Sequence, residues 1–154
     1  TLADLKGKRI AFGDPGSTMS YIVPHYMLDK AGIFADPSTK HQLLYSHTNV
    51  AFGVLTGDFD AGAVKPAVFK KFESQGLRTI ANTPKISEHL FITRSDLPAE
   101  KIKKLRNAML KMAVSDKGLA ALHSIKSSVT GLVEASSSDY KNLRKIILES
   151  KAHH

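Results

Sequence analysis

Small and hydroxyl-bearing residues gather near the start of the chain, where they could bind an oxyanion. The stretch "FGDPGSTMS" (12–20) places Ser17, Thr18, Met19 and Ser20 at the beginning of an apolar segment with helical spacing. Backbone N–H groups at a helix start, together with hydroxyl donors and the helix dipole, suit a phosphoryl group or a similar anion. The same hydroxyls are ordinary helix caps, and the local sequence alone favours the cap.

A second polar junction contains His47, in "SHTNV" (46–50). If both junctions follow neighbouring parallel strands, they lie at the same sheet edge, and His47 could donate a hydrogen bond to the same anion. The alternative is that His47 caps the helix that begins near Thr48. The residues by themselves leave both roles open.

Patterns that would indicate catalysis, nucleotide binding or metal binding are missing from the sequence. It contains no G-x-x-x-x-G-K-[ST], G-x-G-x-x-G, G-x-S-x-G or H-E-x-x-H motif and no cysteine. His25 and Asp29 share a helical face, but no third metal ligand is evident. We therefore expect a binding protein rather than an enzyme, with no cofactor and no metal.

Length and charge bound the remaining function classes. The 154 residues suit one ordinary domain, and the formal charge of +8 would be compatible with a polyanionic partner. The lysines and arginines are scattered, however, and no nucleic-acid motif appears. A small anion is the better expectation. No apolar run approaches the roughly 18 residues of a membrane helix.

Strands and helices are expected to alternate through the first two thirds of the chain. Strands are predicted at 8–13, 41–46, 59–64 and 77–83, with a further extended segment at 89–95. Helices are predicted after residue 17 up to Gly32, at 48–57 and at 66–76. This order predicts an α/β lobe with a parallel sheet covered on both faces. Pro24 should either kink the first helix or leave its first turn irregular.

The last third is expected to be helical, at 98–116, 117–125 and 137–150. Ile102, Leu105 and Met109 fall on one helical face, opposite lysines and arginines. We divide the chain into an α/β anion-binding lobe at 1–95 and a C-terminal helical segment at 96–152, which packs on that lobe or on a partner. Residues 153–154 are interpreted as a tag remnant.

The motifs "GDPGST", "SHTNVAFGVLTGDFDAGAV", "TPKISEHLFITRSDLP" and "GLVEASSSDY", in this order, resemble the substrate-binding proteins of phosphate, phosphite and phosphonate ABC importers. The resemblance implies a type II periplasmic-binding-protein-like fold, in which two α/β lobes close on the phosphoryl or phosphonyl group. It also implies that Ser17, Thr18 and His47 contact the oxyanion, as the matching residues do in relatives. The predicted ligand-binding set is Ser17, Thr18, Met19, Ser20 and His47.

The sequence departs from the family pattern in three respects. Relatives carry roughly another domain's worth of chain before "DLKGKR", so we expect a fragment or reduced relative without the first lobe. Ser20 stands where a glycine is common in the family. Lys65 and Pro66 replace the acidic residues of amine-recognising relatives, which argues against aminoalkylphosphonates and favours an unsubstituted oxyanion.

The resemblance therefore predicts a solute-binding component of an ABC importer, or part of one, in the periplasm or another extracytoplasmic location. Its expected partners are phosphate, phosphite or phosphonate, the ABC permease if the protein is full-length, and a second copy of the chain. The alternative is an extracytoplasmic sensor or protein-interaction module of the same fold. A small phosphotransferring enzyme ranks third, because no acid/base set is found.

Overall fold

The structure, a computed structural model, describes residues 1–87 and 89–152. The predicted tag remnant at 153–154 lies outside the described residues. Contacts between residues group the chain into two compact units, of which the first comprises Thr1–Ile86 with the last helix and the second comprises Ser87–Tyr140. In the described part of the chain, no helix combines the length and the apolar character needed to cross a membrane.

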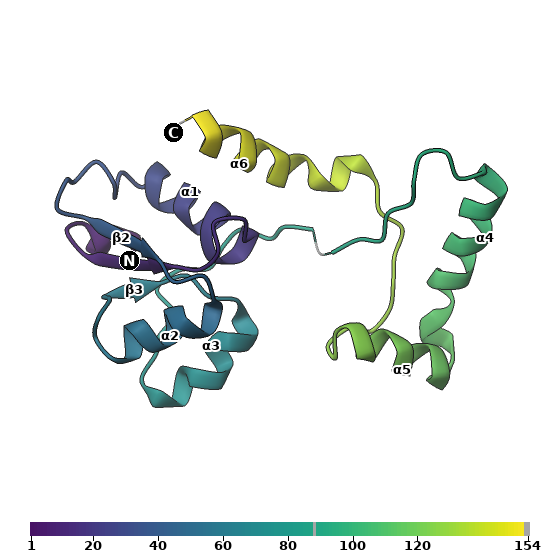
Figure 1. The fold of residues 1–154 in the computed structure, drawn as a ribbon, viewed down its shortest axis with the longest axis horizontal. Coiled ribbons are helices and arrows are strands. Elements are labelled where there is room, and N and C mark those ends of the chain that lie inside the picture. Colours follow the sequence, from purple (N-terminus) through teal and green to yellow (C-terminus); the bar gives the residue numbers. More distant parts are fainter. Residues whose placement is uncertain (88, 153–154) are drawn as a thin grey trace. The chain divides into compact units, whose positions relative to one another are not determined.

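The first unit is built on a three-stranded parallel sheet (Figure 1). Its strands are β1 (Arg9–Phe12), β2 (Lys40–Leu43) and β3 (Ala61–Gly62), in the order β2-β1-β3. Ile10 of β1 is in register with His41 of β2 and with Ala61 of β3. The predicted α/β class with a parallel sheet is confirmed, although β3 is shorter than expected.

Helices cover both faces of this sheet, because each crossover between parallel strands carries one. Figure 1 shows α1 (Val23–Lys30) and α6 (Lys141–Ala152) on one face and α2 (His47–Leu55) and α3 (Pro66–Phe72) on the other. Shorter turns of helix complete the unit: η1 (Leu2–Leu5), η2 (Thr18–Ile22) and η3 (Glu73–Gln75).

The core of the first unit lies between β1 and α1. Phe12 is fully buried and packs its ring edge-on against Tyr21, with 5.4 Å between the ring centroids. The same buried cluster contains Leu5, Ile10, Leu28, Ile33 and Ala61. Apolar burial on this scale is the main force that holds α1 on the sheet, and with it the loop that joins β1 to α1.

The last helix belongs to the first unit, which differs from the predicted division into 1–95 and 96–152. Ile146 of α6 is buried, and Glu149 joins α6 to α1. The Tyr26 hydroxyl donates to Glu149 Oε2 over 3.0 Å, and Lys30 Nζ lies 3.1 Å from the same carboxylate. These contacts span more than a hundred positions of sequence, so local spacing does not reveal them.

The strand predicted at 77–83 is wrong, because the structure has no strand there. The predicted extended segment at 89–95 does not form a strand either. Most side chains of both segments are exposed. A strand forms only where a neighbouring backbone completes its hydrogen bonds. The edge strand β3 is two residues long and pairs with β1 alone, so residues 77–83 do not add a fourth strand beside it.

The second unit is helical. It contains α4 (Ala99–Leu110), η4 (Met112–Val114), α5 (Asp116–Ile125) and η5 (Ser137–Tyr140). The helix predicted at 98–116 therefore ends earlier, and a tight turn leads to α5. Gly118 permits this turn, since a Cβ on it would lie 2.0 Å from the Met112 carbonyl oxygen. None of the residues of α4 is buried.

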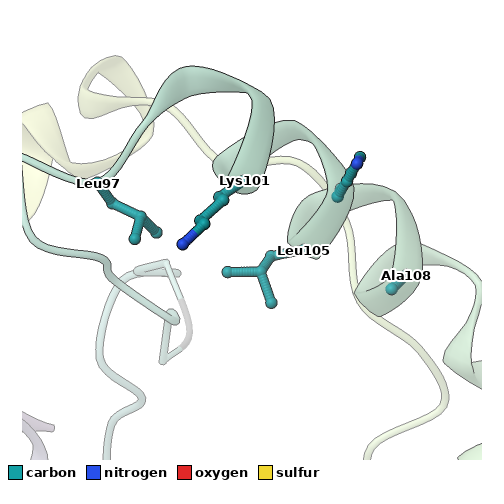
Figure 2. Close-up of a pocket in the computed structure, with 5 residues that line it drawn as sticks. Leu97, Lys101, Leu105 and Ala108 are labelled. Carbon is teal, nitrogen blue, oxygen red and sulfur yellow. The ribbon is translucent and has the colours of Figure 1, made fainter.

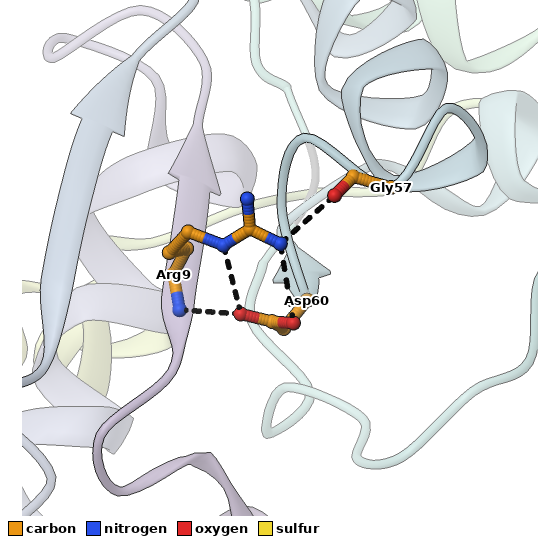
Figure 3. Close-up of polar contacts among 3 residues, drawn as sticks. All are labelled: Arg9, Gly57 and Asp60. Carbon is orange, nitrogen blue, oxygen red and sulfur yellow. Dashed lines mark hydrogen bonds and ion pairs between the residues drawn. The ribbon is translucent and has the colours of Figure 1, made fainter.

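An Arg9–Asp60 pair fixes the amino edge of the sheet (Figure 3). The Arg9 backbone N–H donates to Asp60 Oδ2 over 2.8 Å, and Nη2 of Arg9 donates to the Gly57 carbonyl over 2.8 Å. The Arg9 amide and guanidinium hydrogen bonds lower the pKa of Asp60 below its usual value. The pair joins the start of β1 to the loop before β3, at the edge opposite to the polar junctions.

Candidate functional site

The polar junctions predicted from the sequence meet at the carboxyl edge of the sheet. β1 leads into residues 13–20, β2 leads into Ser46 and His47, and β3 leads into residues 63–65. Because the three strands are parallel, all three connections leave from the same edge. Ligands of open α/β sheets collect at this edge.

The first junction leads into a single π-helical turn, η2, which comes just before α1. The proline at position 24 explains it: an α-helix running through this turn would need the Pro24 nitrogen to donate to the Ser20 carbonyl, and proline has no N–H. The Gly13 N–H donates to that carbonyl instead, over 3.0 Å. Of the two effects predicted for Pro24, a kink or an irregular first turn, the structure shows the irregular turn.

Ser17 caps this turn and leaves two amides free for other partners. Its Oγ accepts from the Ser20 N–H over 3.1 Å, while its own N–H donates to the Asp14 carbonyl. Within the part of the chain that the structure describes, the Thr18 and Met19 N–H groups have no hydrogen-bond acceptor. Unused donors at a helix start are suited to an anion.

Ser20 connects the first junction to residues 63–65, the segment that follows β3. Its side chain is fully buried, and its Oγ donates to the Ala63 carbonyl over 2.7 Å. Gly13 provides the space, since a Cβ there would lie 2.2 Å from Ser20 Oγ. The Ser20 hydroxyl proton is therefore engaged within the protein, and its predicted contact with a ligand stays a prediction.

A second hydrogen bond connects His47 to the same segment, residues 63–65. Its Nδ1 accepts from the Lys65 backbone N–H over 3.1 Å. Ser46, not His47, caps α2, because Ser46 Oγ accepts from the Asn49 N–H. With Nδ1 acting as an acceptor, the proton of the neutral imidazole is assigned to Nε2.

Burial lowers the pKa of His47 below its usual value, and the positive charge of Lys65 lowers it further. The ring is therefore neutral at pH 7, and Nε2–H is a hydrogen-bond donor without a charge. Since the pKa of the folded state lies below that of the unfolded chain, His47 favours folding above the ordinary histidine pKa, and this contribution is lost as the pH falls through the lowered value.

Tyr45, just before these residues, has a left-handed backbone conformation that the sequence analysis missed. Its φ angle is 59°, and the Ser46 N–H donates across it to the Leu44 carbonyl over 2.8 Å. The left-handed region costs a residue with a Cβ about 1–2 kcal/mol, and such strain tends to occur at functional sites. No local signal reveals it, because tyrosine is not a residue expected at a positive φ angle.

The structure thus connects two of the predicted residues, Ser20 and His47, through residues 63–65, the segment after β3. Ser20 is hydrogen-bonded to Ala63, and His47 to Lys65. In the sequence, Lys65 stands out only as a departure from a family pattern, and no local signal singles out Ala63. Together the three connections offer two backbone amides, hydroxyl groups and one imidazole N–H, all of which can donate to oxygen.

The hollow shown in Figure 2 is of a different kind and belongs to the second unit. It is shallow and apolar, and it is lined by Leu97, Lys101, Lys104, Leu105 and Ala108. It contains no residue of the predicted site. Among the residues that the structure describes, no group of three or more histidines, cysteines or carboxylates is arranged to hold a metal ion.

Comparison with known proteins gives one family match, over residues 1–140, to the family described as "ABC transporter, phosphonate, periplasmic substrate-binding protein". The chain is 25% identical over 157 residues to a probable ABC transporter phosphite binding protein, PhnD1, of Prochlorococcus marinus strain MIT 9301. It is 26% identical over 166 residues to the phosphate-import protein PhnD of Mycolicibacterium smegmatis. Each alignment covers 94% of this chain and 52% of the relative, so the chain spans about half the length of these relatives.

Solved structures show the same fold. PhnD1 of Prochlorococcus marinus in complex with methylphosphonate matches with a TM-score of 0.78 and 24% identity, over 97% of this chain and 59% of that one. XAC2383 from Xanthomonas citri, bound to ATP, matches with a TM-score of 0.79 and 20% identity, over 99% of this chain and 61% of that one. At these identities the likeness establishes the fold and not the ligand.

Proposed function

Because the chain belongs to the family of periplasmic substrate-binding proteins of phosphonate ABC transporters, we propose that it is the solute-binding component of an ABC importer, or part of one. Its ligand is phosphate, phosphite or a phosphonate, bound by Ser17, Thr18, Met19, Ser20 and His47. One observation supports this site above all: the hydrogen bonds Ser20–Ala63 and His47–Lys65 hold both predicted junctions to one segment at the carboxyl edge of the sheet.

The donors at this edge have the chemistry that a phosphoryl group needs. The Thr18 and Met19 amides lack acceptors among the described residues, and His47 presents Nε2–H as a neutral donor. Asp14, the nearby carboxylate in the chain, already accepts from the Gly16 N–H over 2.8 Å. The unprotonated oxygens of phosphate, phosphite and phosphonates accept hydrogen bonds, so they match a set made of donors.

Affinity at this site is expected to be low. Each charge-assisted hydrogen bond contributes about 1.5–3 kcal/mol, so four or five supply roughly 6–15 kcal/mol. Association costs an estimated 4–15 kcal/mol or more. The dissociation constant of this chain for phosphate should therefore be about 1 mM or weaker.

Titration with inorganic phosphate, followed by NMR, tests the proposal. The amides of residues 17–20 and the ring of His47 should shift together and saturate, and the His47→Ala variant should weaken the binding about tenfold by removing one donor. Sodium chloride at matched ionic strength is the control for non-specific charge effects. Shifts spread over the scattered lysines, with no effect of His47→Ala, would show that the junction is only a helix cap.

The family implies an extracytoplasmic location, and we propose that in the complete importer the protein delivers its ligand to an ABC permease. We also propose that it binds its ligand without converting it, since the site supplies donors but no nucleophile paired with a general base.

We further propose that the chain forms a homodimer through the exposed apolar face of α4. Leu105 is 49% exposed and lies beside Leu97 and Ala108 in the hollow of Figure 2. Apolar patches of this kind tend to mark association surfaces. Light scattering should give the mass of a dimer, and Leu105→Asp should give a monomer, whereas the control Lys103→Asp should not. A monomer at every accessible protein concentration would contradict the proposal.

A further inference from the structure

Lys65 has a fixed backbone position at the candidate site. It is the last residue before α3, with φ −71° and ψ 152°, and proline at position 66 restricts the preceding residue to such extended conformations. Its N–H donates to His47 Nδ1 over 3.1 Å. The backbone of Lys65 is therefore held next to His47, while its side chain is exposed.

The ammonium group of Lys65 supplies positive charge where the other predicted ligand-binding groups are neutral. Its charge is felt at the ring of His47, whose pKa it helps to lower. Among the described residues, none of the ion pairs involves Lys65. His47 contributes a donor without a charge, as do the amides of Thr18 and Met19. A bound ligand would therefore meet a full positive charge on one side of the site.

We propose that Lys65 is a specificity-determining residue, which favours phosphonates that carry a second anionic group and disfavours phosphonates that carry an ammonium group. This inference rests on the proposed function, because it assumes that the phosphonyl group occupies the junction of residues 17–20 and His47. The Lys65 backbone is hydrogen-bonded to His47, so its long, exposed side chain starts beside one of the groups that would hold the phosphonyl oxygens. A carboxylate on that substituent is attracted to the ammonium group, and an amine is repelled.

Three phosphonates of similar length separate this charge effect from binding of the phosphonyl group itself: propylphosphonate, 3-phosphonopropionate and 2-aminoethylphosphonate. At pH 7.5, NMR titration of the wild-type chain should show 3-phosphonopropionate binding about 3–10 times more tightly than propylphosphonate, and 2-aminoethylphosphonate more weakly by a similar factor. These factors correspond to one unit charge at roughly 6 Å in a highly polarisable surface environment.

Variants of Lys65 change the charge and keep the backbone N–H that holds His47. Lys65→Met should bring both affinity ratios close to one, Lys65→Glu should reverse their order, and Lys65→Arg should keep the wild-type order. Lys70→Met, which removes an exposed lysine from the last turn of α3, should leave the ratios unchanged. The ¹⁵N shifts of His47 in each variant report whether the ring keeps its tautomer.

The outcomes distinguish this inference from the proposed function. If neither phosphate nor propylphosphonate shifts residues 17–20 and His47 in the wild-type chain, the proposed function fails and this inference fails with it. If propylphosphonate binds there but the two ratios are the same in the wild type and in Lys65→Met, the proposed function stands and the role of Lys65 is refuted.

Discussion

Replacing Gly13 by alanine should abolish detectable phosphate binding and lower the free energy of unfolding by about 2–5 kcal/mol, the sum expected for overpacking a tight site and breaking a buried hydrogen bond. A Cβ at this position would lie 2.2 Å from Ser20 Oγ and 2.8 Å from Ser20 Cβ. Ser20 cannot move aside freely, because it is fully buried and donates to the Ala63 carbonyl. The turn that carries the Thr18 and Met19 amides would have to shift as a whole.

Urea unfolding and phosphate titration of the same samples measure this effect. Gly16→Ala is the matched control, since its added Cβ would meet only the exposed Asp14 side chain, at 3.1 Å. A second variant separates the two causes: Gly13→Ala combined with Ser20→Gly removes the clash but not the loss of the hydrogen bond to Ala63, so it should regain only the stability lost to overpacking. If Gly13→Ala unfolds at the same urea concentration as the wild type, the packing at this junction has been misassigned.

Replacing Phe12 by alanine should lower the free energy of unfolding by about 3–5 kcal/mol, as is typical of a fully buried phenylalanine. Phe12 is 0% exposed and lies in β1, the central strand of the sheet. Its ring packs against Tyr21 and His25 on the α1 side and against His41 of β2, at centroid distances of 5.4, 5.7 and 5.8 Å. A large cavity at the centre of a three-stranded sheet would weaken all of these contacts together.

Thermal and urea unfolding followed by circular dichroism check this expectation. Phe52→Ala is the control, because Phe52 is 48% exposed, with its ring centroid 5.0 Å from that of Phe72. We expect it to cost about 1 kcal/mol, since less apolar surface leaves water at this position on folding. Equal losses in the two variants would contradict a core centred on Phe12.

The difference in burial between these two phenylalanines could not be predicted from the sequence. Both lie in apolar segments, and nothing in their immediate neighbours separates them. The position of Phe12 in a strand between two other strands makes it buried, whereas Phe52 lies on a helix surface. Burial depends on which segments pair, and pairing depends on contacts between distant parts of the chain.

The candidate site, too, could be predicted from the sequence only in part. The sequence predicted the two polar junctions and a cap at Ser17 or Thr18, but for the second helix it offered His47 as the possible cap, whereas Ser46 caps α2. It did not reveal that the Ser20 hydroxyl donates to Ala63, 43 positions away, or that the Lys65 amide donates to His47, 18 positions away. Both hydrogen bonds exist because parallel strands bring three loops to one edge.

By itself the sequence predicted the alternation of strands and helices, a cap at Ser17 or Thr18, an effect of Pro24 on the first helix and the family, because these depend on residues that are close in the chain or on ordered motifs. Only the tertiary structure decided the loss of the strand predicted at 77–83, the left-handed conformation of Tyr45 and the grouping of α6 with the sheet. A strand needs a partner backbone, a strained residue needs surroundings that hold it, and a helix needs an apolar surface on which to pack. Each of these conditions is supplied by residues far away in the sequence, so no local pattern could have predicted it.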